Sequence, residues 1–164
     1  MMRELVFLMG QYEARLPCDR RYARNHMWCL HLEGDRYRFG FSAYAVRLMR
    51  DVYFLDWQIA PGTTLRVSQP IGHIETSKAT SDLFAPADGT LIAFNTLLLQ
   101  DPSWINVEPY ERGWLFDMAC AAAPGMPAED YVAFLAPAWE KAQKLLKRQM
   151  NLRDPGGSVS GGPA

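Results

Sequence analysis

One lysine near the middle of the chain stands in a setting that suits covalent attachment. Lys78 lies between the small residues Ser77 and Ala79, and an apolar, strand-like half flanks this polar centre on each side within residues 72–89. The pattern predicts a β-hairpin with the lysine at its tip. A long amine on a stiff, exposed tip is well placed to carry an attached group, although most lysines in such places are simply solvated. The local chemistry leaves both interpretations open.

The cysteines argue against a disulfide framework and against a structural zinc site. Cys18, Cys29 and Cys120 are odd in number, lie far apart and include no Cys-x-x-Cys pair. Disulfide-rich domains and structural zinc sites depend on paired, regularly spaced cysteines. We therefore expect reduced thiols in a reducing compartment.

The histidines do not form a metal-binding pattern either. The chain has three, His26, His31 and His73, without a His-x-x-x-His pair. If residues 27–32 form a strand, the odd offset of five sends His26 and His31 to opposite faces, so too few ligands converge on one point. The chain also has no glycine-rich phosphate loop and no supported Ser-His-Asp constellation.

The composition predicts one compact domain without a strong electrostatic field. The chain has 164 residues, is 49% hydrophobic and has a formal net charge of -1. This apolar content suits a single core, and the balanced charge gives no attraction for nucleic acid or an acidic membrane. No apolar run approaches the roughly 18 residues of a membrane helix, and the longest near the start is too short for a secretory signal. We expect an unexported, cytoplasmic protein.

The elements that must position Lys78 are mostly short strands. Residues 36–41 alternate aromatic residues with Arg or Gly, which is the period of a half-buried strand. Ser42 predicts the cap of a helix of about two turns that continues to residue 48. β-Branched, aromatic and turn-forming residues predict further strands at residues 52–59, 64–67, 71–76, 82–85, 90–95 and 114–118. Short strands at this spacing predict a small antiparallel sandwich or flattened barrel.

The chain changes character beyond residues 124–127. Apolar residues at three-to-four spacing from Tyr131 to Leu146 predict a helix that is interrupted at Pro137. Basic residues are concentrated in its last turns, where cations complement the carbonyl end of a helix dipole. A nucleic-acid-binding surface is the less favoured interpretation, because no platform of aromatic residues accompanies these cations for bases to stack on. Residues 154–164 are rich in Gly, Pro and Ser, and we expect them to be disordered.

A resemblance to a known family reaches well beyond the lysine. Residues 75–82, Glu-Thr-Ser-Lys-Ala-Thr-Ser-Asp, are similar to the lipoylation motif of the glycine cleavage system H proteins, which have Glu-Ser-Val-Lys-Ala followed by an acidic position. Further landmarks of that family appear here in the same order: Tyr22, His26-x-Trp28, Glu33-Gly34, Gly40, the Ala-Pro-x-x-Gly turn at residues 85–89, Asn95, Asp101-Pro102, Ile105-Asn106, Pro109-Tyr110 and Gly113-Trp114-Leu115. The resemblance covers roughly residues 22–135.

The resemblance implies both a fold and a function. The fold would be mainly β, the barrel-sandwich hybrid or flattened β-barrel of lipoyl domains, with short helices that include one at the C-terminal end. Lys78 would carry lipoic acid in covalent amide linkage, and the protein would be a non-catalytic carrier. In the family's cycle the arm takes an aminomethyl group from glycine decarboxylase and delivers it to aminomethyltransferase, after which dihydrolipoyl dehydrogenase reoxidises the dithiol. A lipoyl-attaching enzyme is a further implied partner.

Four other positions acquire expected roles from the resemblance. Glu75 and Asp82 flank the tip, where the lipoyl-attaching enzyme would recognise them, although acidic residues on a solvated hairpin are common. His26 and Tyr110 would line a cleft against which the arm folds.

The chain also departs from the family at four positions. Met27 stands where the family usually has Glu, Ala43 where it has an acidic residue, Arg50 where it has Gly, and Ser77 where it has Val. Met27 cannot accept a charge-assisted hydrogen bond from an aminomethyl cation. Two alternatives therefore stay open: an H-like lipoyl carrier of another pathway, such as lipoate-dependent sulfur oxidation, and an unmodified interaction module with the same fold. A biotin carrier is disfavoured because its lysine normally lies between methionines.

The expected organisation has four parts. Residues 1–21 form an N-terminal extension that lies outside the resemblance and either packs as an extra element or frays. Residues 22–123 form the lipoyl or H-protein-like domain, residues 124–153 form a C-terminal helical segment, and residues 154–164 form the tail.

Overall fold

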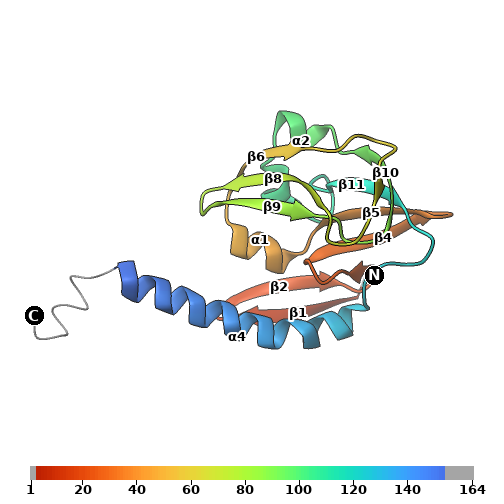
Figure 1. The fold of residues 1–164 in the computed structure, drawn as a ribbon. Helices are drawn as coiled ribbons and strands as arrows, with labels where there is room; N and C mark the ends of the chain where they lie inside the picture. Colours follow the sequence, from red (N-terminus) through yellow and green to blue (C-terminus); the bar gives the residue numbers. More distant parts are fainter. Residues whose placement is uncertain (1–2, 154–164) are drawn as a thin grey trace, which may run out of the picture. The chain divides into compact units, whose positions relative to one another are not determined.

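The computed structural model describes residues 3–153 of the chain. The chain divides into two compact units, with the boundary between Glu129 and Asp130. The first unit contains every described strand and the helices α1 to α3, and the second contains most of α4 (Ala128–Arg153). Figure 1 shows both units as ribbons.

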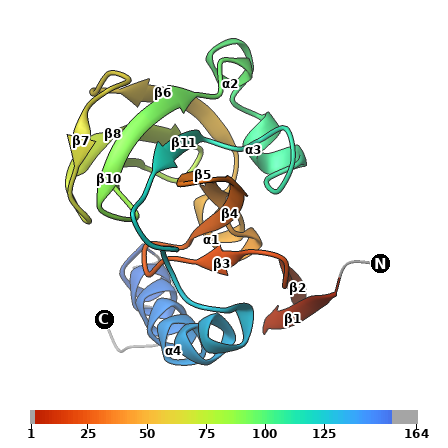
Figure 2. The same cartoon turned by 90° about the vertical axis from the view of Figure 1, so that its right-hand side faces the viewer.

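Two antiparallel sheets form the body of the first unit. Six strands make the larger sheet, in the order β3 (Arg21–Tyr22), β4 (Met27–Glu33), β5 (Arg36–Phe41), β11 (Phe116–Ala119), β10 (Gly89–Phe94) and β7 (Thr64–Leu65). Three strands make the smaller one, in the order β6 (Val52–Trp57), β8 (Pro70–Thr76) and β9 (Thr80–Phe84). Figure 2 shows the two sets of strands enclosing a common interior. The prediction of a mainly β, flattened barrel-sandwich fold is confirmed.

The core lies between these two sheets. Phe39 and Phe116 from the six-stranded sheet contact each other with ring centroids 5.5 Å apart, and both are fully buried. Ile74 and Leu83 from the three-stranded sheet belong to the same apolar cluster. Because each sheet has one apolar face, neither could stay in water alone, and packing them together removes both faces from solvent.

Close approach of β6 to β8 requires a glycine. A Cβ atom on Gly72 would lie 2.2 Å from the Asp56 carbonyl oxygen of the neighbouring strand. A larger residue would push the two strands apart. This contact fixes β8, which is one arm of the hairpin that carries Lys78.

Helix α1 (Ala43–Met49) begins as the sequence predicts. The Ser42 hydroxyl accepts a hydrogen bond from the Ala45 N–H at 3.2 Å, which caps the helix. The helix has about two turns, as expected. Two further short helices, α2 (Leu97–Gln100) and α3 (Trp104–Val107), were not predicted.

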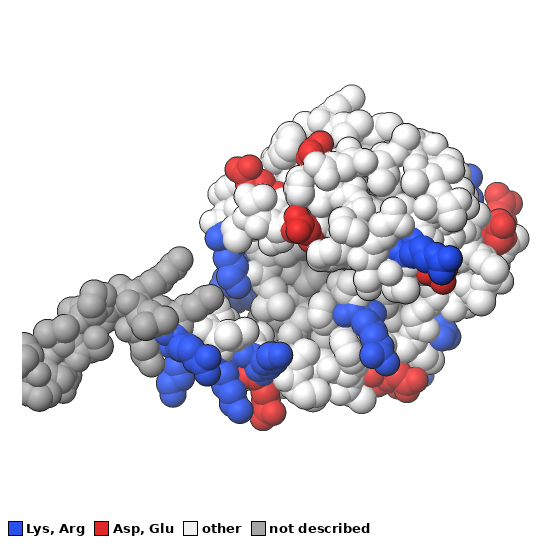
Figure 3. Space-filling model, viewed as in Figure 1, with Lys and Arg blue, Asp and Glu red and all other residues white. Residues whose placement is uncertain are grey.

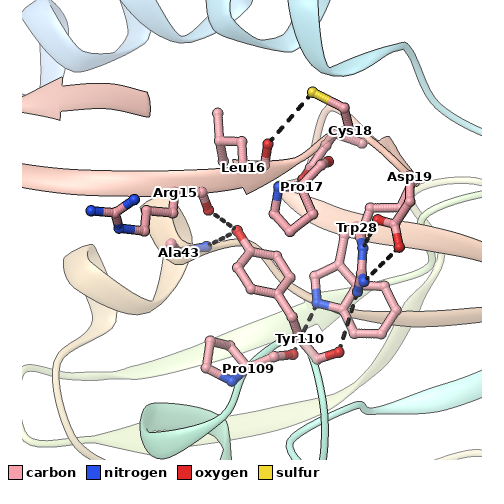
Figure 4. A network of polar contacts seen from close by, with 11 residues as sticks. Arg15, Leu16, Pro17, Cys18, Asp19, Trp28, Ala43, Pro109 and Tyr110 are labelled. Atoms are coloured by element: carbon pink, nitrogen blue, oxygen red, sulfur yellow. Dashed lines mark hydrogen bonds and ion pairs between the residues drawn. The ribbon is translucent and has the colours of Figure 1, made fainter. Parts of the chain in front are cut away.

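The N-terminal residues form an extra element. Strands β1 (Glu4–Met9) and β2 (Tyr12–Pro17) pair as an antiparallel hairpin. Tyr110 binds this hairpin to the rest of the unit, because its hydroxyl donates to the Arg15 carbonyl oxygen at 2.6 Å and accepts from the Ala43 N–H at 2.8 Å. Figure 4 shows this network, in which the Trp28 indole N–H also donates to the Pro109 carbonyl oxygen at 3.0 Å.

Helix α4 corrects one prediction. The sequence predicts an interruption at Pro137, yet the helix runs unbroken from Ala128 to Arg153 with that proline inside it. A proline removes one intrahelical hydrogen bond and crowds the preceding turn, and here the flanking residues Ala136 and Ala138, which are strong helix formers, keep the helical path on both sides. The expected tail at residues 154–164 lies outside the described residues. No helix in the described part of the chain is both long and apolar enough to span a membrane.

Candidate functional site

Lys78 lies at the exposed turn between β8 and β9. The turn comprises residues 77–79, and Lys78 is exposed to solvent. The Thr76 N–H donates to the Ala79 carbonyl oxygen at 2.9 Å, and the Thr76 hydroxyl oxygen accepts from the N–H groups of Lys78 and Ala79 at 3.2 Å each. This local network closes the turn without using the lysine side chain. The prediction that Lys78 stands at a hairpin tip is confirmed.

The acidic residues Glu75 and Asp82 lie on the outer face of the same hairpin. Glu75 is paired with Thr80, and His73 is paired with Asp82 across the strands. Residues directly opposite each other share a face, so Glu75 and Asp82 are diagonal neighbours, about 7–8 Å apart. The His73 Nδ1–H donates to Asp82 Oδ1 at 2.9 Å, whereas Glu75 has no ion pair among the described side chains.

A groove begins on the inner side of this hairpin. Its volume is about 200 Å³, and α1, β9 and the turn before β4 supply most of its lining. Its apolar members include Met27, Leu48, Met49, Ile74 and Phe84, and its polar members are Asn25, His26, Ser81 and Asp82. We call it the β9 groove. Because Ser81 and Asp82 lie three and four residues after Lys78, the groove starts within reach of a group attached to the tip.

His26 is one of the two residues that were expected to line a cleft, and it does line the β9 groove. It lies in the turn before β4, with φ at 72°, and its ring contacts Tyr44 with centroids 4.9 Å apart. Burial lowers the pKa of His26 to about 4. At neutral pH the imidazole is therefore uncharged, and it adds a neutral wall to the groove.

Tyr110, the other expected cleft residue, lies elsewhere. It is not among the residues that line the β9 groove. Its hydroxyl is occupied by the Arg15 and Ala43 backbone groups, and burial raises its pKa well above the usual value. The Arg20 guanidinium lies 5.2 Å from its ring centroid. Tyr110 is connected to the groove only through α1. Its hydroxyl accepts from the N–H of Ala43, the first residue of that helix, and other residues of α1 line the groove.

Two of the departures noted in the sequence are Met27, in the β9 groove, and Ser77, at the tip. Met27 is buried and lines the β9 groove. Ser77 exchanges hydrogen bonds with Asp51, the residue that follows Arg50. Asp82 is the one acidic residue among the described residues that line the groove, and its carboxylate is bonded to His73 on the outer face of the hairpin.

Some residues of the site were not anticipated from the sequence. The pairing of His73 with Asp82 follows directly from the hairpin register once its tip is fixed, so it could have been found. Leu48, Met49 and Phe84 could not, because they converge on the β9 groove only after α1 packs beside β9.

An antiparallel sandwich with a lysine at the tip of one hairpin is the arrangement of a carrier domain. The comparisons agree. The model of the family described as Glycine cleavage H-protein matches residues 20–137. A glycine cleavage system H protein from Thermosynechococcus vestitus is 37% identical over 121 residues, covering 73% of this chain and 94% of that protein. Another, from Nitratidesulfovibrio vulgaris, is 36% identical over 109 residues, covering 66% and 84% respectively.

A solved structure supports the same assignment. The crystal structure of a glycine cleavage system H protein from Mycobacterium marinum superposes with a TM-score of 0.64 at 31% sequence identity, covering 72% of this chain and 97% of that one. The chain belongs to the glycine cleavage H-protein family. The β1–β2 hairpin lies before the matched residues.

Proposed function

We propose that this protein is a lipoylated carrier and that Lys78 holds the lipoyl group. The observation that carries the proposal is the position of Lys78, exposed at a hairpin tip whose turn is closed by hydrogen bonds of Thr76. The amine is free of any ion pair among the described side chains. Attachment joins its nitrogen to the lipoyl carbonyl carbon, with loss of one amine proton and of the leaving group of the activated acyl donor.

The residues around Lys78 fit such a group. Ser77 and Ala79 are small and exposed, so an enzyme can approach the amine from either strand. The apolar part of the β9 groove suits an aliphatic chain and a sulfur-containing ring. Glu75 and Asp82 present carboxylates on the outer face, where we propose that the lipoyl-attaching enzyme recognises them.

The proposed cargo is an aminomethyl group, taken from glycine decarboxylase and delivered to aminomethyltransferase. When bound, the lipoyl group would supply a disulfide able to take up and release this one-carbon unit, and dihydrolipoyl dehydrogenase would restore the disulfide from the dithiol left after its release. The chain's own residues hold the arm and exclude water. Met27 and the neutral His26 form an uncharged wall of the groove.

The protein would itself be non-catalytic, and we place it in the cytoplasm. Cys18, Cys29 and Cys120 are all free. Burial raises the pKa of Cys29 to about 12 and that of Cys120 to about 11, so both thiols stay protonated at neutral pH. We propose that the redox chemistry of the carrier resides on the attached group and not on these two thiols.

Glycine–bicarbonate exchange tests the proposed cargo. The lipoylated full-length protein, added to purified glycine decarboxylase, should support exchange of labelled bicarbonate into glycine, and Lys78→Arg should not. A lipoylated sample that is inert in this exchange would overturn the aminomethyl assignment and favour a carrier for another pathway. A sample that gains no lipoyl group from an active ligase would favour an unmodified interaction module.

A further inference from the structure

A second groove lies on the other side of the tip. It has a volume of about 350 Å³, and the residues that line it are Tyr12, Val46, Arg47, Arg50, Asp51, Ser77 and Asn106. We call it the arginine groove. It adjoins Lys78 directly, because Ser77 is the preceding residue. It differs in character from the β9 groove, since two arginines and one aspartate are among its lining residues.

The two arginines have no ionic partner in the first unit. Both are exposed, and neither forms an ion pair among the side chains described for residues 3–148. The guanidinium carbon of Arg47 lies 4.6 Å from the Tyr12 ring centroid, which orients this cation without neutralising it. Asp51 lines the same groove and offsets one of the two charges.

Arg50 occupies a backbone conformation that suits glycine. Its φ is 67° and its ψ is -147°, a region that residues with a Cβ rarely adopt. Hydrogen bonds hold it there, since its N–H donates to Val46 O at 3.0 Å and its carbonyl oxygen accepts from Asn106 Nδ2 at 2.7 Å. Glycine would meet the same backbone requirement without strain. A binding role for the guanidinium group would explain why an arginine stands here in spite of the backbone strain.

We propose that the arginine groove docks an acidic surface of the enzyme that attaches the lipoyl group to Lys78. This inference rests on the proposed function. An enzyme that acts on the far end of the arm can reach it at a distance from the hairpin. The attaching enzyme must bring the lysine nitrogen itself into its active site, so its surface has to lie against the flanks of the tip. Figure 3 shows both basic and acidic side chains on the side of the first unit to which the tip points in Figure 1.

Two variants remove an arginine charge from the groove without an expected loss of stability. Arg50→Gly removes one cation and relieves the backbone strain, so its resistance to urea should equal or exceed that of the wild type. Arg47→Gln leaves the backbone unchanged. Arg66→Gln is the matched control, since Arg66 is also exposed but lies before β8, at the end of that strand away from the tip. A strand of the length of β8 spans about 20 Å.

The measurement is the initial rate of lipoylation of the full-length protein by a purified attaching enzyme, followed by intact mass at several protein concentrations. At about 20 mM salt we expect kcat/KM to fall about 2- to 5-fold for each of Arg47→Gln and Arg50→Gly, with kcat unchanged. At about 300 mM salt the differences should narrow, because mobile ions screen exposed charges. Calorimetric titration of the unmodified protein with the enzyme should show the same order of affinities.

Three results would overturn the inference. Wild-type rates for both arginine variants at low salt would refute docking through this groove. Losses of equal size at low and high salt, or in Arg66→Gln as well, would refute an electrostatic role for these residues. Absence of any adduct on the wild-type chain would refute the proposed function and this inference with it, and it differs from the first two results because every variant would then be unmodified.

Discussion

Ser77 and Asp51 exchange two hydrogen bonds. The Ser77 N–H donates to the Asp51 carbonyl oxygen at 2.8 Å, and the Asp51 N–H donates to Ser77 Oγ at 3.2 Å. The pair ties the residue next to Lys78 to the segment that follows α1. Because α1 supplies one wall of the β9 groove, the tip and the groove are held in fixed relation to each other.

Ser77→Ala should loosen this connection. The variant keeps the first hydrogen bond and loses the second, so we expect the free energy of unfolding to fall by about 0.5–1.5 kcal/mol. Hydrogen exchange at the Asp51 amide should become faster. Ser81→Ala is the control, because the structure gives Ser81 no side-chain hydrogen bond. Equal exchange rates at Asp51 in the wild type and in Ser77→Ala would contradict the assignment.

Tyr110→Phe tests how the N-terminal hairpin is attached. The change removes one hydroxyl and leaves two backbone groups, Arg15 C=O and Ala43 N–H, without their partner. We expect a loss of about 1–2 kcal/mol in urea unfolding, since the N–H of the buried Ala43 loses its hydrogen-bond partner. Tyr53→Phe, at a tyrosine whose side chain is 58% exposed, should change little. A Tyr110→Phe protein as stable as the wild type would show that the hairpin is held by other contacts.

Asp117 is a buried carboxylate that two arginines share. Its carboxylate is fully buried and accepts hydrogen bonds from both Arg36 and Arg38 at 2.8–3.1 Å. Asp117→Asn should lower stability by about 2–4 kcal/mol, because two cations then lose their common partner. The exposed Asp35→Asn should lie within about 0.5 kcal/mol of the wild type. Unfolding free energies that do not distinguish the two variants would contradict this role.

His26 should make stability depend on pH between about 4 and 6.5. Burial lowers its folded pKa to about 4, whereas an unfolded histidine has a pKa near 6.5. Within this window the unfolded chain binds more protons, so stability rises with pH and is lost as pH falls. The expected change is on the order of 1–3 kcal/mol.

A pair of variants isolates that dependence. His26→Asn removes the titrating ring and keeps a residue that tolerates positive φ, so its stability should vary less over this range than that of the wild type. His31→Gln, at an exposed histidine, should retain the wild-type dependence. A His26→Asn profile that parallels the wild type would show that other groups produce the acid sensitivity.

Local sequence signals predicted most of the sheet and the place of Lys78. Alternation fixed the strand at Arg36–Phe41, Ser42 marked the start of α1, and the polar centre at residues 76–80 located the hairpin turn. These features depend on neighbours in the chain. The roles expected for Glu75, Asp82 and His26 stay predictions, although the structure places all three beside the tip or at the β9 groove.

The remaining features depend on contacts between distant segments. The β9 groove exists because α1 and the turn at Asn25–His26 lie beside β9. No local sequence pattern predicts this packing. Tyr110 bonds to two backbone groups, which have no residue-specific signal in a sequence. The strong tendency of proline to end a helix predicts a break at Pro137, yet the helix continues through this residue.

Intact mass spectrometry with peptide mapping tests the central claim most directly. The full-length protein, made in a cell that contains lipoate and an active attaching enzyme, should gain one lipoyl group in amide linkage at Lys78, and Lys78→Arg should remain folded and unmodified. A wild-type protein that stays unmodified while a known acceptor in the same cell is lipoylated, or an adduct at any other lysine, would contradict the account.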